Sequence, residues 1–493
     1  MSVGRARLPR VAISSIAALA CLAWPVARAL ELPAVPWPNG SAPSDPALDA
    51  MVAEATALAD RERADRWLEA YERGEDHEHF GLAQEDIDRG AYDLAFLFRG
   101  GDAFFEHRFA PYEGLGAGPL APLRRVHGPA RGGPDALGCA DCHALGGPDG
   151  AGTEVENAFF HGDGDGASSA AVRNPPHALG LGFVQALAAE MTRELAFARE
   201  TAIAAHEERT LALATHGVSF GTLVVHADGS VDTRGVEGID SDLVVRPFGW
   251  RGTEARLRRV VEEAARVHSG LQSTVLAGAS QTAPDPERLG AGPWYDPDAD
   301  GVVRELEEGT LTAVAVYLAM LEVPTVLVPG DPALADRWAH GHALFESTGC
   351  EACHRETLEL ADRTWIERPD TTGGPGVTIR LLQDGETPRG SGSVHLFSDL
   401  KRHAMGEALT QPEDDGSGLA TDVWITRPLW GLSDTAPYLH DGRAATIPEA
   451  ILAHDGEARA SRDAFAALDE DGQHDLTIFL MSLARTPRPR YAR

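Results

Sequence analysis

Four cysteines and two histidines form two short motifs with the same spacing. Cys139-Ala-Asp-Cys142-His143 lies in the first third of the chain, and Cys350-Glu-Ala-Cys353-His354 lies in the last third. In each motif the two thiols can form thioethers to the vinyl groups of a haem, and the adjacent histidine can ligate iron. A four-cysteine zinc site is the alternative, but it needs no histidine after each pair. The pattern predicts two covalently bound haem c groups and iron redox chemistry.

An acidic segment between the two motifs predicts a calcium site. Asp296, Asp298 and Asp300 are followed by Gly301, Val302 and Glu307. This spacing supplies side-chain oxygens at positions 1, 3, 5 and 12 of a calcium loop, a backbone carbonyl at position 7 and a turn glycine at position 6. The residues before it do not have a helical pattern, so the prediction is a Ca²⁺ loop that leads into a helix. A solvated acidic turn is the alternative.

A weak internal repeat indicates which elements position the motifs. Gly101-Asp-Ala-Phe-Phe-Glu106 precedes the first motif, and Gly341-His-Ala-Leu-Phe-Glu346 precedes the second. Each predicts a helix that leads toward its motif. The second helix has a clear start, because Asp331 can cap it and Pro332 suits its first position.

Apolar residues spaced i, i+3, i+4 and i+7 predict a closing helix after each motif, around 311–321 and 476–483. A helix, a motif, loops and a closing helix form the plan of a cytochrome c domain. The predicted fold class is mainly α, with two cytochrome c-like haem domains, long loops and an N-terminal helical extension. The predicted boundaries are a signal peptide at 1–29, the extension at 30–98, the first domain with the calcium-type loop at 99–328, and the second at 329–493.

The N-terminus predicts export. Arg5, Arg7 and Arg10 precede a mostly apolar stretch, and Ala27-Arg28-Ala29 supplies small residues for cleavage. We expect a periplasmic or otherwise exported chain without a membrane span. A lipoprotein acylated at Cys21 is the less favoured alternative.

The net charge restricts the class of partner. Removal of residues 1–29 takes away four arginines and no acid, so the net charge changes from −32 to −36. Nucleic acid and anionic membranes are poor partners for such a charge. A redox protein with a basic surface is the expected electron donor, and a charge that only maintains solubility is the alternative.

Several further motifs resemble those of the di-haem cytochrome c peroxidase superfamily, and within it the di-haem oxidoreductase branch. The resemblance covers roughly residues 95–485. Its motifs are Glu113-Gly-Leu-Gly116, Arg173-Asn-Pro-Pro176 with Gly180-Leu-Gly182, Arg246-Pro-Phe-Gly-Trp250, Ser398-Asp-Leu400, and Pro428-Leu-Trp-Gly431 leading into Thr435-Ala-Pro-Tyr-Leu-His-Asp-Gly-Arg-Ala444. It implies two facing cytochrome c folds, with one haem for electron transfer and one that reacts with hydrogen peroxide.

The resemblance also implies roles for individual residues. His454 occupies the position of the second haem's distal ligand, where methionine is usual, and Met405 is the rival ligand. A helix-end histidine that bonds Asp455 or a backbone carbonyl is the alternative for His454. Glu190 resembles the acid that moves a proton during cleavage of the O–O bond. The distal side of the first haem is either open or filled by one of four histidines, His161, His177, His206 or His268.

Together these inferences predict an oxidoreductase of the cytochrome c peroxidase type. Electrons would enter through the haem of His354 and His454, and hydrogen peroxide would be reduced at the haem of His143. A pure electron-transfer cytochrome and a di-haem oxidase of an organic or protein substrate are the alternatives.

Overall fold

The computed structural model describes residues 81–116, 126–127, 134–160, 170–275, 302, 305–381, 392–412 and 415–485. All of them fall within one compact unit, residues 60–493. The signal peptide, Cys21, His161, and the calcium-loop residues Asp296, Asp298 and Asp300 lie outside the described residues.

The fold class is mixed, so the expectation of a mainly α protein is wrong. Helix accounts for 39% and strand for 17% of the structure. The strands form several small sheets of two or three members. The helices and 3₁₀ turns are α3 (Gln84–Asp88), α4 (Leu94–Glu106), η1 (Pro111–Glu113), η2 (Cys139–Asp141), η3 (Glu154–Glu156), α5 (Leu181–Ala204), α6 (Leu257–Ala264), the π-helical turn η5 (Ala265–Ser269), α8 (Glu308–Met320), α9 (Pro332–Ser347), η6 (Cys350–Ala352), η7 (Glu407–Leu409), α10 (Ile447–Ala453), η8 (Gly456–Ala458), α11 (Arg459–Ala466) and α12 (Glu470–Met481).

The strands pair mostly as antiparallel neighbours. The three-stranded sheets are β1 (Val126–His127), β2 (Ala158–Phe160) and β3 (Ala171–Arg173), and β4 (Arg209–Thr215), β5 (Val218–Val225) and β6 (Val231–Asp232). The pairs are β7 (Thr325–Val326) with β14 (Leu483–Ala484), β8 (Leu358–Leu360) with β11 (Gly392–Val394), β9 (Thr364–Glu367) with β10 (Val377–Arg380), and β12 (Arg402–Ala404) with β13 (Val423–Ile425).

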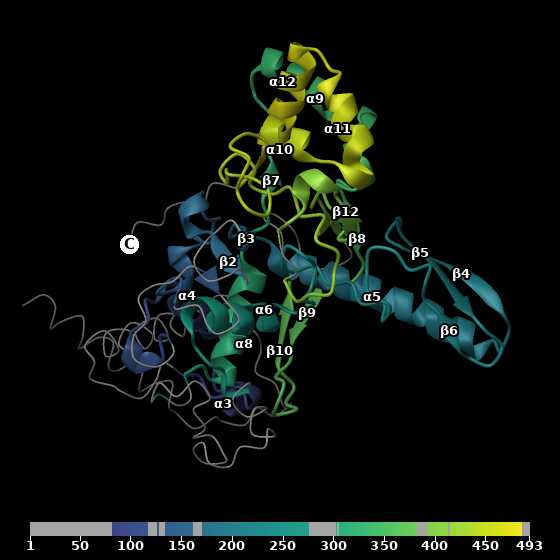
Figure 1. Ribbon diagram of the computed structural model, residues 1–493. Coiled ribbons are helices and arrows are strands. Elements are labelled where there is room, and N and C mark those ends of the chain that lie inside the picture. Colours follow the sequence, from purple (N-terminus) through teal and green to yellow (C-terminus); the bar gives the residue numbers. More distant parts are fainter. Residues whose placement is uncertain are drawn as a thin grey trace, which may run out of the picture. The chain divides into compact units, whose positions relative to one another are not determined.

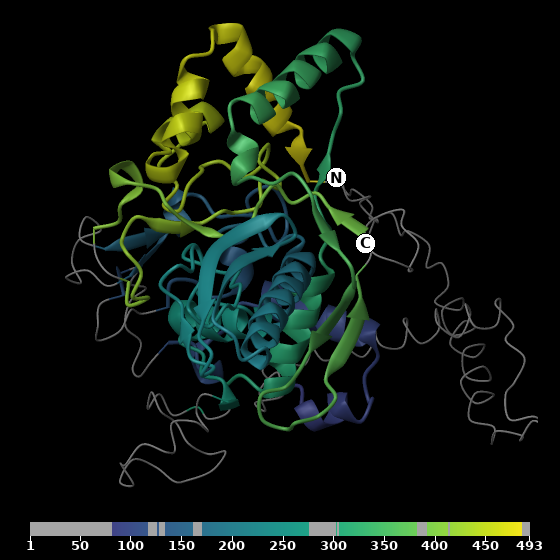
Figure 2. The ribbon, with the colours of Figure 1, turned by 90° about the vertical axis from the view of Figure 1, so that its right-hand side faces the viewer.

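The β4–β5 hairpin is the largest departure from a cytochrome plan. His216 and Gly217 both have positive φ, 51° and 75°, as the central residues of a tight type I′ turn require. Buried Leu213, Phe220 and Leu223 face the core, and the hairpin packs along α5 (Figure 2). Alternating β-branched and apolar residues around this turn are the sequence signal that distinguishes it from a loop.

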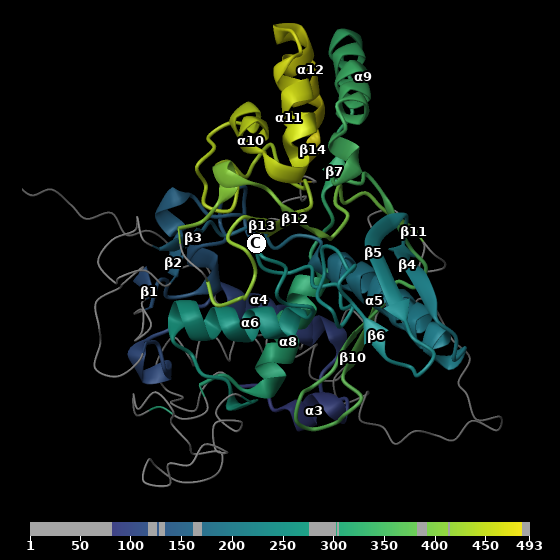
Figure 3. The same cartoon turned by 45° about the vertical axis from the view of Figure 1, so that its right-hand side comes forward.

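Both helices that lead to the motifs pack directly on a closing helix. Helix α4 contacts α8, and α9 contacts α12, which lies beside it in Figure 3. A Cβ on Gly101 would lie 2.3 Å from the carbonyl oxygen of Ala313, and one on Gly341 would lie 1.9 Å from that of Asp475. The repeated glycine therefore marks the point where each pair of backbones crosses.

The predicted start of α9 is confirmed. The side chain of Asp331 accepts a hydrogen bond from the backbone N–H of Leu334 at 2.9 Å, and Pro332 is the first helical residue. Helices α8 and α12 correspond to the two predicted closing helices.

Two hydrophobic clusters organise the described residues. The smaller joins α9 to α12 through Phe345, Phe465, Leu476 and Phe479, and these helices gather at one end of Figure 1. The larger includes residues of α4, α5 and α8, but also Leu358, Trp365 and Trp430 from beyond residue 328. The division into domains at 328/329 stays a prediction.

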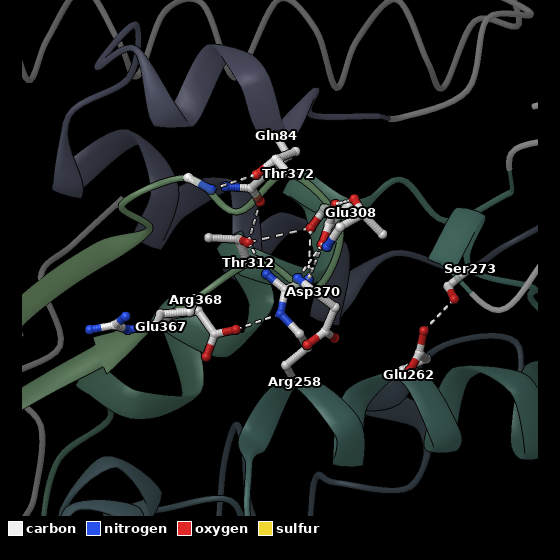
Figure 4. Close-up of polar contacts among 12 residues, drawn as sticks. Gln84, Arg258, Glu262, Ser273, Glu308, Thr312, Glu367, Arg368, Asp370 and Thr372 are labelled. Atoms are coloured by element: carbon white, nitrogen blue, oxygen red, sulfur yellow. Dashed lines mark hydrogen bonds and ion pairs between the residues drawn. The ribbon is translucent and has the colours of Figure 1, made fainter. Parts of the chain in front are cut away.

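A buried polar network also joins distant segments of sequence. Arg258 and Glu367 are both 0% exposed, and the guanidinium Nε donates to the carboxylate at 2.5 Å (Figure 4). Arg258 also donates to Thr312, which in turn donates to Gln84 at 2.6 Å. Burial raises the pKa of Glu367 against the opposing effect of the arginine. Glu367 also pairs with Arg256 at 3.4 Å, and Arg258 also pairs with Glu308 at 3.8 Å. Removal of either charge would therefore leave the other with only its longer ion pair, which should cost less than the roughly 3–5 kcal/mol typical of a fully unpaired buried charge.

Candidate functional site

The second Cys-x-x-Cys-His motif begins directly after α9. Gly349 has a φ of 82° and turns the chain into η6, which carries Cys350 and Cys353. Both cysteines and His354 line a cavity of about 300 Å³. Its wall is largely apolar and aromatic, and includes Trp250, Trp424, Trp430, Leu429, Ile447 and Ile451. An apolar cavity beside two thiols and an imidazole suits a flat hydrophobic cofactor.

His354 and His454 face one another across this cavity. Their ring centroids are 6.5 Å apart. With a metal–imidazole distance of about 2 Å on each side, and a centroid about 1.1 Å behind each donor nitrogen, two ligands of one ion have centroids about 6 Å apart. The spacing therefore fits a single metal ion held between the two rings.

Each ring is oriented by a backbone carbonyl. The Nδ1 of His354 lies 3.0 Å from the carbonyl oxygen of Phe397, and the Nδ1 of His454 lies 2.7 Å from that of Ala450. A donating Nδ1–H leaves Nε2 with a free lone pair for a metal. Burial lowers the pKa of His354 to about 4 and lowers the pKa of His454, so both rings are neutral near pH 7, as iron ligands must be.

The rival ligand Met405 also lines the cavity. Its backbone N–H donates to the carbonyl of Asp422 at 2.8 Å, next to the β12–β13 pair. The structure thus brings His354, His454 and Met405 to one cavity, and the opposed imidazoles favour His454 as the ligand.

The first motif has a similar local form. Cys139 begins η2, and the Nδ1 of His143 lies 3.2 Å from the carbonyl oxygen of Gly150. Burial lowers the pKa of the ring to about 4, against the opposing effect of the carbonyls of Gly150 and Pro176. Phe105 at the end of α4 packs on the imidazole, with centroids 5.8 Å apart. Burial raises the pKa of the Cys139 thiol to about 12 and also raises that of Cys350.

The described candidates for the distal side of the first haem have different surroundings. His206 is exposed in the turn after α5. His177 lines the cavity of the second motif, and its Nδ1 accepts a hydrogen bond from the N–H of Leu179 at 3.2 Å. His268 lies 2.8 Å from a carboxylate oxygen of Asp135, and its charge would depress the pKa of His143. A carboxylate partner on Nδ1 is common for metal-binding histidines. His177 also interacts electrostatically with His143, so both His177 and His268 stay candidates.

Glu190 lies away from the cavity lining. Its carboxylate is 3.0 Å from Nε2 of His216 and accepts the backbone N–H groups of Ala361 and Asp362 at 3.0 and 3.2 Å. It therefore ties α5 to the tip of the hairpin and to the β8–β9 loop. Its catalytic role stays a prediction.

Two members of the predicted calcium loop are described. Val302 is partly buried, and Glu307 directly precedes α8 without capping it through its side chain. The ligand set as a whole stays a prediction.

The TAPYLHDG block shapes the cavity wall. His440 stacks on Trp424, with centroids 3.8 Å apart, and both line the cavity. Burial lowers the pKa of His440 to about 3. Its carbonyl accepts a hydrogen bond from the N–H of Asn174 at 2.6 Å. The block therefore attaches the Arg173-Asn-Pro-Pro176 segment to the cavity.

Several charged side chains of the cavity wall were not identified from the sequence, among them His403 and Arg427. His403 lies between the carboxylates of Asp399 and Glu457, at 2.9 and 2.8 Å. Although burial lowers its pKa, hydrogen bonds with Asp399 and Cys353 raise the pKa to about 11. Arg427 lies over the ring of Trp250. Single histidines and arginines outside a motif carry no sequence signal that separates them from surface charges.

Opposed histidines across an apolar cavity, beside a Cys-x-x-Cys-His turn, define a haem-protein type of site. Residues 313–483 match the model of the family described as "Di-haem oxidoreductase, putative peroxidase". The match begins within α8 and contains the second motif, His454 and α12, and it confirms the family resemblance over this range. The family description implies haem cofactors, and the first motif lies outside the matched residues.

Other comparisons are distant. A search of curated proteins finds no match. Among solved structures, hydrazine synthase of Kuenenia stuttgartiensis under 20 bar xenon aligns with a TM-score of 0.32 and 13% identity, covering 77% of this chain and 94% of that chain. At that TM-score the similarity does not define a shared fold. In the described part of the chain, no helix is both long and apolar enough to cross a membrane.

Proposed function

We propose that the protein is an exported di-haem c-type cytochrome that acts as a peroxidase and takes electrons from a basic redox protein. The observation that carries the proposal is the opposed pair His354 and His454 beside Cys350 and Cys353. The match of residues 313–483 to a di-haem oxidoreductase family supports the reaction class.

The two motifs would form two haem sites with different roles. Cys139, Cys142 and His143 would hold the first haem, and Cys350, Cys353, His354 and His454 would hold the second. When bound, iron supplies one-electron transfer and, where a coordination position is open, reaction with hydrogen peroxide. His354 and His454 both line the cavity of the second motif and could ligate one iron, which would leave no position open for peroxide. This site is therefore suited to electron entry, and peroxide would react at the haem of His143.

The chain's own groups prepare these sites. Backbone carbonyls accept hydrogen bonds from Nδ1 of His143, His354 and His454, which leaves the Nε2 of each ring available for iron. The segment Asn174–His177 lines the cavity of the second motif, and the carbonyl of Pro176 acts on the pKa of His143. The segment therefore lies beside both sites and would be on the path of electrons between them.

The test is a haem count followed by spectroscopy of the exported protein. Two haems should stay on each chain after denaturation. In the half-reduced protein one haem should stay low-spin while the other becomes high-spin by electron paramagnetic resonance, and peroxide should then be consumed with oxidation of a reduced donor.

The opposed imidazoles also favour a second candidate, a pure electron carrier. Two low-spin haems and no peroxide consumption would identify it. Zinc in place of iron, or a single covalent haem, would refute both proposals.

A further inference from the structure

Arg427 is the arginine of the cavity wall without a charged partner among the described residues. It directly precedes the Pro428-Leu-Trp-Gly431 motif and lines the same cavity as His354 and His454. No carboxylate within the described residues forms an ion pair with its guanidinium. Burial lowers its pKa to about 10, although part of its surface stays accessible. A cation in such a place carries a desolvation cost unless an anion joins it.

The second arginine of the wall shows the contrast. Arg462 donates to Asp455 at 3.1 Å and to Asp463 at 2.7 Å. The wall's acid Glu457 is already paired with His403. Within the described lining, Arg427 is therefore the uncompensated charge, and the occupant of the cavity would have to supply the anion.

Trp250 holds Arg427 in place. The guanidinium carbon lies 5.4 Å from the centre of the indole ring, within range of a cation–π contact. The indole N–H donates to the carbonyl of Asn174 at 2.8 Å, which fixes the ring. A planar guanidinium on a fixed aromatic surface is well suited to bind a carboxylate through two parallel hydrogen bonds.

We infer that Arg427 binds a carboxylate of the cofactor in the second cavity, a haem propionate. The inference rests on the haem binding in the proposed function but not on its peroxide chemistry. Arg427 lies near His177, because its charge helps to depress the pKa of that histidine, after the larger effect of burial. The carboxylate would therefore be held close to the segment Asn174–His177.

An arginine that binds the propionate should change the reduction potential of the haem iron. Neutralisation of a propionate favours the reduced iron, so loss of the arginine should lower the reduction potential of that haem. The variants are Arg427→Gln, Arg427→Lys, and Arg234→Gln as control, because Arg234 is 91% exposed and paired with Asp232 on the surface. The readouts are haem content, the propionate bending band in the resonance Raman spectrum, and a spectroelectrochemical titration.

Arg427→Gln should shift the propionate band and lower the reduction potential of one haem, and the potential of the other haem should stay the same. In Arg234→Gln the band and both potentials should equal those of the wild type. Arg427→Lys should restore the potential in large part but not the band, since an ammonium group cannot form the two parallel bonds. If Arg427→Gln does not accumulate, an unchanged band in Arg427→Lys overturns the inference.

Two further outcomes oppose the inference. Unchanged band and potential in a fully loaded Arg427→Gln protein would overturn it. A second result would also overturn it. In this result, the propionate band of Arg427→Gln is unchanged, and added acetate perturbs the spectrum of the wild type but not that of Arg427→Gln. The arginine would then bind free carboxylates. Wild-type protein that binds both haems but consumes no peroxide would refute the peroxidase proposal alone.

Discussion

At the scale of the residue, the two Cys-x-x-Cys-His motifs are predictable because anchor and ligand are adjacent in sequence. A distal ligand is different, because it comes from a remote part of the sequence. His354 and His454 are about a hundred residues apart, and only folding brings them together. Periodicity and composition do not distinguish His454 from other histidines. Only the family resemblance identified it, and the structure places it opposite His354.

His454 sets the properties of the second haem if it ligates the iron. His454→Ala should open a coordination position and convert a low-spin signal to high-spin. His454→Met should raise the reduction potential, because a thioether favours ferrous iron more than imidazole does. Electron paramagnetic resonance and redox titration measure both effects.

The matched control is His395→Ala, a histidine outside the cavity lining. An unchanged low-spin spectrum and potential in His454→Ala would exclude ligation by His454. Met405 would then be the ligand to replace next.

A variant of Glu190 can distinguish a catalytic role of this residue from a purely structural one. Because its carboxylate holds His216 and two backbone N–H groups, Glu190→Gln should lower the free energy of unfolding by about 1–3 kcal/mol. Turnover per folded molecule should change little. Loss of a proton-transfer group would instead lower turnover by about 10²–10⁴-fold. Thermal unfolding and peroxide kinetics separate the two, with Glu200→Gln on the exposed face of α5 as control.

At the scale of the element, the sequence predicted the helices around each motif but not the sheets. A helix repeats its apolar pattern over several turns, and Asp331 with Pro332 marks a start. The strands are mostly two to four residues long, too short for alternation to stand out. The β4–β5 hairpin is long enough, and its His216-Gly217 turn was the signal that sequence reasoning missed.

The repeated glycines are the sharpest prediction at this scale. Gly341→Ala should push α9 away from α12, because its methyl group would meet the carbonyl of Asp475. We expect a loss of about 1–3 kcal/mol in the free energy of unfolding, as for other overpacked sites. Gly101→Ala should act similarly between α4 and α8.

Gly330→Ala is the control, because its new methyl group would have no atom within 4 Å among its surroundings. Chemical denaturation of the three variants measures the effect. Equal stability of Gly341→Ala and Gly330→Ala would contradict direct backbone contact at the crossing.

At the scale of the whole molecule, contacts link parts of the chain that sequence reasoning separated. The larger core and the Arg258–Glu367 pair both include residues from either side of position 328. A buried ion pair between residues 109 apart in sequence leaves no local pattern. The division into two domains stays a prediction, and the packing between the two repeats had no sequence signal.

The net charge of −32 predicts how an electron donor should respond to salt. The second-order rate of reduction by a basic redox protein should fall by about tenfold or more from low ionic strength to about 0.5 M salt. Stopped-flow mixing measures this rate. Reduction by a small neutral reagent is the control, and a donor rate independent of salt would contradict electrostatic attraction.

The partly enclosed thiol of Cys139 bears on how the protein is made. With its pKa near 12, this thiol stays protonated and poorly reactive in the folded chain. The proposed thioethers would therefore form more readily before folding encloses this thiol. Biogenesis would then favour one order, from export to attachment to folding, and a chain that folds first would attach its cofactor more slowly.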